Sequence, residues 1–208
     1  MDSNTETDCH ELLLRLAGRL ADRHLWRFRD WLAAGAVSAL AHALPLTLLR
    51  ERVPITAQES RLLTGSLSAA GADADRLNAV PWVDEIAELD YTFTSESPEW
   101  VMMGDSVAVV LGAILRDRTE VGQVRACWRA HRSGGGPITR VILVSATTRY
   151  ARLAGDLQRV LRALGSHEPS VEVIPEGMEL PPYHKAALAA SEPLLTGVID
   201  EAGQLVPS

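Results

Sequence analysis

Residues 140–175 read RVILVSATTRYARLAGDLQRVLRALGSHEPSVEVIP, and the architecture follows from this segment more than from any other. The apolar run at 141–144 predicts a buried strand, and apolar residues then recur at helical spacing over 150–164. A second apolar run at 171–174 predicts another strand. A strand, a helix and a strand in this order predict a βαβ unit, whose two parallel strands are joined by a right-handed crossover.

The residues just before this unit predict an antiparallel neighbour for its first strand. Apolar and polar side chains alternate in VRACWRAHR at 124–132, as in a strand that packs on one face. The SGGGP run at 133–137 then lies between two strands and lacks the Gly-Lys-Ser/Thr of a phosphate-binding P-loop, so it is interpreted as a hairpin loop. Residues 106–115 are apolar and rich in valine, which favours a strand, although their length and Gly112 leave a helix open.

Beyond the βαβ unit, the sequence predicts a proline-led helix over 183–191 and a hairpin over 194–206 at the sheet edge. At the other end of the chain, helical spacing over 11–25 and a capping box at Thr56–Glu59 belong to a series of four or five short helices. We therefore predict a mixed α/β fold. It comprises an N-terminal small helical bundle (1–70), an acidic irregular linker (71–104) and a mixed-sheet α/β domain (105–208) that contains the βαβ crossover.

Charge is distributed unevenly along the chain. Residues 71–115 carry one basic and nine acidic side chains, whereas residues 116–165 carry ten basic and three acidic ones. The basic segment either pairs with its acidic flanks or forms a positive patch for an anionic partner. Nineteen arginines stand against a single lysine, which indicates a GC-rich bacterial genome rather than a binding surface. The first 70 residues carry no net charge, which argues against a DNA-binding helix-turn-helix there.

One candidate site lies where the first strand of the βαβ unit meets its helix. Ligands of such sheets bind beyond the carboxyl end of the strand, where the helix N-terminus offers free amides and a partial positive charge. An anion, a phosphate or a carboxylate, would be held there by side chains of Ser145, Thr147, Thr148, Arg149 and Arg152. Thr147 or Thr148 acting as an ordinary helix cap would explain the same residues without a ligand.

A second candidate site is an aromatic cluster in the helical region. Trp26, Phe28 and Trp31 lie close together in sequence, and their simplest interpretation is core packing. If one face remains exposed, the cluster is a docking surface for a helix of another protein.

Motifs for catalysis, metals and membranes are missing from the sequence. The histidines lack metal-ligand spacing, no serine lies in a nucleophile elbow, and no catalytic pair can be nominated, so no metal or cofactor is expected. The cysteines Cys9 and Cys127 are interpreted as buried thiols. No apolar run is long enough to span a membrane, and Met1 to Asp8 are polar and acidic, which leads us to expect a cytoplasmic protein.

Three functional hypotheses follow. The first is a non-catalytic, cytoplasmic interaction or regulatory protein whose helical module docks a protein partner. The second is an α/β domain that binds a phosphate, a carboxylate or a nucleotide and that would act as an enzyme on such a compound. The third is nucleic-acid binding through the arginines of residues 116–165, which requires these arginines to lie on one face. Partner identity, substrate and oligomeric state do not follow from the sequence.

Overall fold

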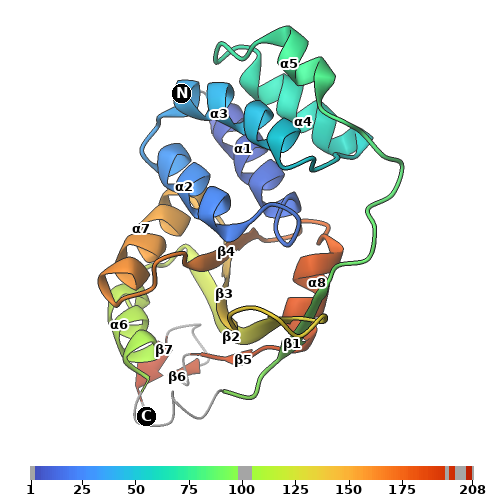
Figure 1. Ribbon diagram of the computed structural model, residues 1–208. Helices are drawn as coiled ribbons and strands as arrows, with labels where there is room; N and C mark the ends of the chain where they lie inside the picture. The colour runs from blue at the N-terminus through green and yellow to red at the C-terminus, as the bar shows by residue number, and fades with distance from the viewer. Residues whose placement is uncertain (1–2, 98–104, 195–196, 200–204, 208) are drawn as a thin grey trace. The chain divides into compact units, whose positions relative to one another are not determined.

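A computed structural model describes residues 3–97, 105–194, 197–199 and 205–207 of the 208-residue chain. The chain forms two compact units (Figure 1). The helical unit comprises Met1–Asp90 and Tyr150–Gln158, and the sheet unit comprises Tyr91–Arg149 and Arg159–Ser208. The described residues form eight helices and a mixed sheet, which confirms the predicted α/β class.

The helical unit is built from five short helices around a core of leucines. Its own helices are α1 (Ser3–Arg15), α2 (Asp22–Ala33), α3 (Val37–Arg50), α4 (Ala57–Leu67) and α5 (Ala74–Ala79). The largest contribution to the core comes from side chains that recur at helical spacing: Leu12, Leu13, Leu16, Leu40, Leu44, Leu48, Leu63 and Leu67. Burial of one such leucine contributes about 2 kcal/mol, so these side chains are the main stabilising term of the unit.

The predicted helix over 11–25 is interrupted in the structure. Helix α1 ends at Arg15, Gly18 has a positive φ of 79°, and α2 begins only at Asp22. Glycine adopts this left-handed conformation at little cost, so the chain turns at Gly18 although the apolar periodicity continues. The turn places Arg19 outside both helices.

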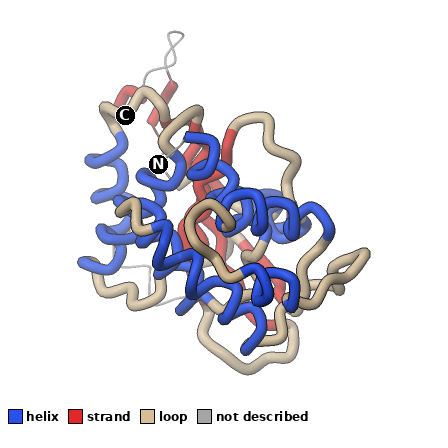
Figure 2. The backbone as a smooth tube through the Cα atoms, turned by 90° about the horizontal axis from the view of Figure 1, so that it is seen from above, coloured by secondary structure: helices blue, strands red, loops and turns tan. Residues whose placement is uncertain are grey.

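The sheet unit contains the predicted mixed sheet. Its strands are β1 (Tyr91–Thr94), β2 (Val121–His131), β3 (Thr139–Ala146), β4 (Ser170–Pro175) and β5 (Glu192–Pro193). They lie side by side in the order β1-β2-β3-β4, and β5 also pairs with β2. Figure 2 draws the strands in red and the helices in blue. Strands β3 and β4 are parallel and are joined through α7 (Tyr150–Ala163), which confirms the βαβ unit. The other pairs are antiparallel, and the glycine-rich run is the β2–β3 hairpin loop.

The strand favoured for residues 106–115 is wrong, because they form helix α6 (Ser106–Leu115). The side chain of Asp105 caps this helix by accepting a hydrogen bond from the backbone nitrogen of Ala108. Asp105 is itself held by the guanidinium of Arg140 on β3, which forms two hydrogen bonds to its carboxylate. Only Leu111 and Leu115, one turn apart, are buried, so tertiary contacts and the cap outweigh the strand propensity of the valines.

The C-terminal predictions hold in part. Helix α8 (Pro182–Ala189) starts with the expected proline. The expected hairpin also exists, since β6 (Gly197–Ile199) pairs with β7 (Leu205–Pro207), while residues 200–204 between them lie outside the described part. These two strands form a sheet of their own, so among the described strands they do not extend the edge of the main sheet.

We predict that Asp105→Ala lowers the free energy of unfolding by about 2 kcal/mol, since it removes a helix cap and leaves Arg140 without its carboxylate. The hydrogen bond from Arg140 holds the pKa of Asp105 below its usual range. A lowered pKa contributes stability at neutral pH that is lost as the pH falls through the folded-state value. In urea denaturation, the difference between the wild type and Asp105→Ala should therefore narrow below about pH 4.

The exposed Asp117 supplies the control for this measurement. Asp117→Ala should change the free energy of unfolding by less than about 0.5 kcal/mol. A difference between wild type and Asp105→Ala that stays constant from pH 7 to pH 3 would contradict the role assigned to the Asp105–Arg140 pair.

Candidate functional site

Two residues of the predicted anion site, Ser145 and Thr147, form hydrogen bonds within the sheet unit. The hydroxyl of Ser145 accepts a hydrogen bond of 2.7 Å from the backbone nitrogen of Gln123. The backbone nitrogen of Thr147 donates to the carbonyl of Glu120 at 3.0 Å. A Cβ atom at Gly122 would lie 2.6 Å from the Ser145 hydroxyl, so glycine is what allows this close approach. Ser145 and Thr147 therefore fasten the end of β3 to the start of β2.

The other three residues of that set, Thr148, Arg149 and Arg152, are exposed. Arg149 is the N-cap residue of α7, in the left-handed conformation with φ 56°, and its side chain makes no capping hydrogen bond. The expectation that Thr147 or Thr148 caps this helix is therefore wrong. Every helix has free backbone N–H groups at its N-terminus, so their presence here does not identify a ligand. Anion binding by these residues stays a prediction.

The aromatic cluster of α2 does not form one exposed face. Phe28 is buried, and its ring lies 5.7 Å from that of Trp31. Trp26 and Trp31 are half-buried, and the backbone carbonyl of Trp26 accepts a hydrogen bond from Gln158. Core packing accounts for Phe28, and a docking role for Trp26, Phe28 and Trp31 stays a prediction.

Three arginines of the basic segment, residues 116–165, form hydrogen bonds with other residues of the sheet unit. Arg125 binds the hydroxyl and carbonyl of Ser191, Arg129 donates to the hydroxyl of Tyr183, and Arg140 binds Asp105. The strand register places Arg125 and Arg129 on one face of the sheet, whereas Arg140, opposite Trp128, is on the other. These three arginines do not share one face, and nucleic-acid binding through the remaining arginines of residues 116–165 stays a prediction.

Four buried polar side chains lie between the sheet and α8, and we call them the polar cluster: Arg129, Glu172, Tyr183 and His184. The imidazole Nε2 of His184 lies 2.9 Å from a carboxylate oxygen of Glu172, and Arg129 donates to the Tyr183 hydroxyl at 2.9 Å. The guanidinium of Arg129 also lies 4.7 Å from the ring centroid of Tyr91. Buried charges are tolerated when they are paired in this way, so the cluster holds α8 to the sheet.

The polar cluster contains a histidine–carboxylate pair of the kind used in general acid–base catalysis. However, His184 is 0% exposed and Glu172 is 1% exposed, so no reactant reaches them in this conformation. The neighbouring thiol of Cys127 is also buried, and desolvation raises its pKa to about 12. A thiol with that pKa is protonated at neutral pH and is a poor nucleophile. The cluster is therefore closed to solvent in the described sheet unit.

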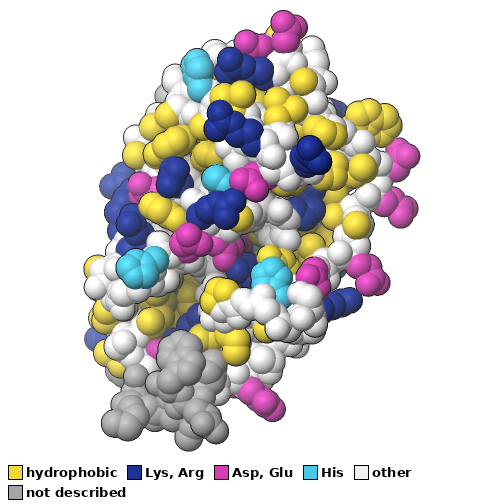
Figure 3. Space-filling model, in the orientation of Figure 1, with side chains coloured by type: hydrophobic (Ala, Val, Ile, Leu, Met, Phe, Trp, Pro, Cys, Tyr) yellow, Lys and Arg dark blue, Asp and Glu magenta, His cyan; other side chains and the backbone are white. Residues whose placement is uncertain are grey.

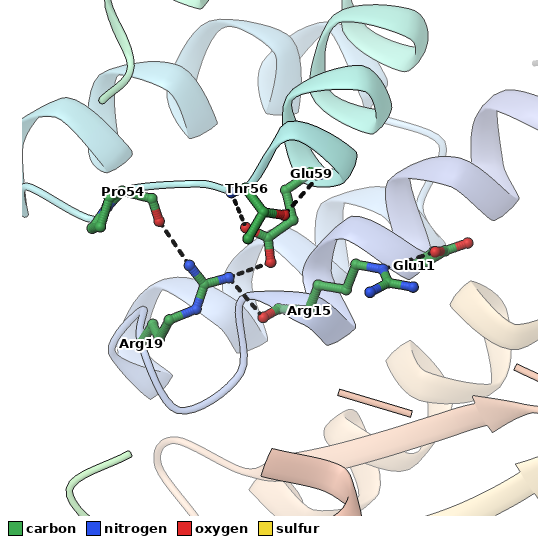
Figure 4. A network of polar contacts seen from close by, with 6 residues as sticks. All are labelled: Glu11, Arg15, Arg19, Pro54, Thr56 and Glu59. Carbon is green, nitrogen blue, oxygen red and sulfur yellow. Dashed lines mark hydrogen bonds and ion pairs between the residues drawn. The ribbon is translucent and has the colours of Figure 1, made fainter. Parts of the chain in front are cut away.

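A second buried polar network lies in the helical unit (Figure 4). The guanidinium of Arg19 donates to the carbonyl of Pro54 at 2.7 Å and to that of Arg15 at 2.9 Å, and it forms an ion pair with Glu59. The other carboxylate oxygen of Glu59 accepts a hydrogen bond from the backbone nitrogen of Thr56. The predicted capping box of α4 is thereby confirmed, and Arg19 extends it to the turn after α1.

The Arg19 side chain is only 11% exposed, and that of Glu59 is 4% exposed. Burial lowers the pKa of Arg19, and the charge and hydrogen bond of Glu59 oppose this effect. Removal of one partner from such a pair typically costs 3–5 kcal/mol, because the other charge is left buried without compensation. The network therefore fixes the segment that contains Pro54 and Thr56.

This fixed segment holds the chain that follows α5. The backbone nitrogen of Ile55 donates to the carbonyl of Pro81 at 2.8 Å, and the nitrogen of Val83 donates to the carbonyl of Ile55 at 3.0 Å. The two bonds form a parallel bridge between Ile55 and Trp82. Ile55 is buried, whereas Trp82 is 65% exposed, so an anchored backbone presents a tryptophan side chain to solvent.

Acidic side chains follow Trp82 closely. Asp84 and Glu85 are exposed, and within the described residues they make no hydrogen bond or ion pair. In Figure 3, apolar and acidic side chains lie along the segment after α5, which Figure 1 draws in green at the right edge. We call Trp82, Asp84 and Glu85 the Trp82 surface.

The sequence contained partial signals for these features. The capping box placed Glu59 at the start of α4, but its ion pair with Arg19 spans 40 positions and leaves no local pattern. Trp82 was assigned only to an acidic, irregular segment. A lone tryptophan among acidic residues, with no periodicity to bury it, was the available signal.

No protein-family model matches this chain, and no curated protein or solved structure is significantly similar to it. Within the described part of the chain, no group of three His, Cys, Asp or Glu side chains could hold a metal ion. Each helix in that part is too short or too polar to cross a lipid bilayer.

We predict that neither cysteine reacts with Ellman's reagent at pH 8 while the protein is folded. Both Cys9 and Cys127 are free and buried, and burial raises the pKa of each thiol. Two thiols per chain should react after unfolding in guanidinium chloride. Rapid reaction of Cys127 in the native protein, tested with Cys9→Ser as the background, would contradict the closed sheet unit and would reopen a catalytic role.

Proposed function

We propose that this chain is a non-catalytic interaction protein that binds a protein partner through the Trp82 surface. The observation that carries the proposal is the 65% exposure of Trp82 on a backbone fixed by hydrogen bonds on both sides. Tryptophan is among the residues that contribute most to binding energy at protein interfaces. Because the backbone around it is already ordered, binding loses little conformational entropy there.

The competing catalytic interpretation has weaker support. The side chains best suited to acid–base or nucleophilic chemistry, His184, Glu172 and Cys127, are buried in the sheet unit. The exposed residues at the start of α7 have only the general features of a helix N-terminus. An anionic small molecule at Thr148, Arg149 and Arg152 remains the alternative proposal.

A second exposed apolar residue is Val109 on α6, which is 73% exposed. Helix α6 directly follows residues 98–104, which lie outside the described part of the chain. The proposed interface therefore centres on Trp82, whose anchoring backbone contacts lie among the described residues. The location proposed with this function is the cytoplasm, since both described cysteines are free thiols, as is usual in reducing compartments.

We predict that a photoreactive residue at position 82 captures one specific partner. With p-benzoylphenylalanine in place of Trp82, irradiation of cells that produce the protein should give a single cross-linked species of defined mass. The same amino acid in place of Ala39, which is exposed on α3 of the same unit, is the matched control and should give none. Absence of the species at position 82, or an identical species at position 39, would contradict the proposal.

A further inference from the structure

We propose that the occupant of the Trp82 surface is a lysine- and arginine-rich segment of a partner protein. This inference rests on the proposed function and adds the chemistry of the partner. It follows from three properties of the surface: an exposed indole ring, two carboxylates without a partner among the described residues, and the absence of basic residues from residues 81–90.

The charge of the segment is one-sided. Residues 81–90 read PWVDEIAELD, with four acidic side chains and no basic one. The ion pairs described in the helical unit use other carboxylates, those of Glu11, Glu51, Glu59 and Asp73. Asp84 and Glu85 are therefore uncompensated within the described residues, and their field favours a cationic partner.

The indole ring of Trp82 favours the same kind of partner. A lysine ammonium or an arginine guanidinium over a tryptophan face is stabilised by the ring quadrupole, and tryptophan is the strongest of the three aromatic residues in this interaction. The helical unit uses this contact itself, since the guanidinium of Arg27 lies 6.0 Å from the ring centroid of Trp26. A basic segment could bind with one cation over Trp82 and neighbouring cations at Asp84 and Glu85.

The backbone geometry confines this surface to a short stretch of chain. The backbone of Ile55 forms hydrogen bonds with Pro81 and with Val83, one on each side of Trp82. The backbone that carries the indole ring is therefore held in place, and the two carboxylates follow directly after it. Three residues span at most roughly 10 Å, and the chain bends at Asp84 and Glu85, so the indole and both carboxylates are within reach of three or four consecutive basic residues.

The test is a titration followed through tryptophan indole resonances. The chain has five tryptophans, and the Trp82 resonance is identified by its loss in Trp82→Phe. We expect a nona-arginine peptide to shift the Trp82 indole signal and to leave those of Trp26 and Trp128 in place. A neutral glycine–serine peptide of the same length should shift none of them.

A matched pair of double variants separates local recognition from overall charge. Asp84→Asn with Glu85→Gln should weaken binding of nona-arginine about threefold, as expected for two exposed ion pairs. Asp117→Asn with Glu179→Gln removes two exposed carboxylates from the sheet unit and gives the same net charge, so it should leave the affinity unchanged. Equal weakening by both double variants, or no shift of the Trp82 signal, would overturn the basic-segment proposal.

This result and the cross-linking result are independent. A cross-linked partner at position 82 together with an unmoved indole signal would retain the interface and reject its basic chemistry. The opposite result would be no cross-linked species at position 82, together with a shift of the Trp82 indole signal that depends on Asp84 and Glu85. It would retain a cation-binding surface and reject the protein-binding function.

Discussion

The helical unit depends on one buried guanidinium, that of Arg19, which binds Pro54, Arg15 and Glu59 at once (Figure 4). A buried arginine is stable only when its donors are satisfied, so the segment around Pro54 must remain in place. That segment carries Ile55, whose backbone holds the chain at Trp82. A single charge in the turn after α1 thus determines how a tryptophan more than sixty residues later meets solvent.

In the sheet unit, too, buried charged side chains hold one segment of the chain against another. Arg129 and Glu172 lie on the sheet face beneath α8, and each is paired with a side chain of that helix. Such pairs confer little net stability compared with apolar packing, but they require one arrangement of the helix on the sheet. His184 and Glu172, the pair best suited to acid–base chemistry, are thus buried and bonded to each other in the described sheet unit.

Local patterns predicted much of the fold, and contacts distant in sequence account for most of what they missed. The βαβ unit and the capping box at Thr56 followed from periodicity and spacing. Residues 106–115 were misassigned because valine favours strands, whereas the Asp105–Arg140 pair starts a helix there. The Trp82 surface was missed, because it arises from a bridge between Ile55 and Trp82, which no local pattern encodes.

Amide hydrogen exchange at Val83 tests the link between Arg19 and Trp82 most directly. The Val83 amide donates to Ile55, so it should be protected in the wild type. Arg19→Lys keeps the charge but loses the planar fork of donors, and it should reduce protection at Val83 about tenfold, equivalent to about 1.4 kcal/mol. The amide of Phe28 on α2 should be unchanged. Exchange of Val83 at the rate of a free peptide in the wild type, or unaltered protection in a folded Arg19→Lys protein, would contradict the account.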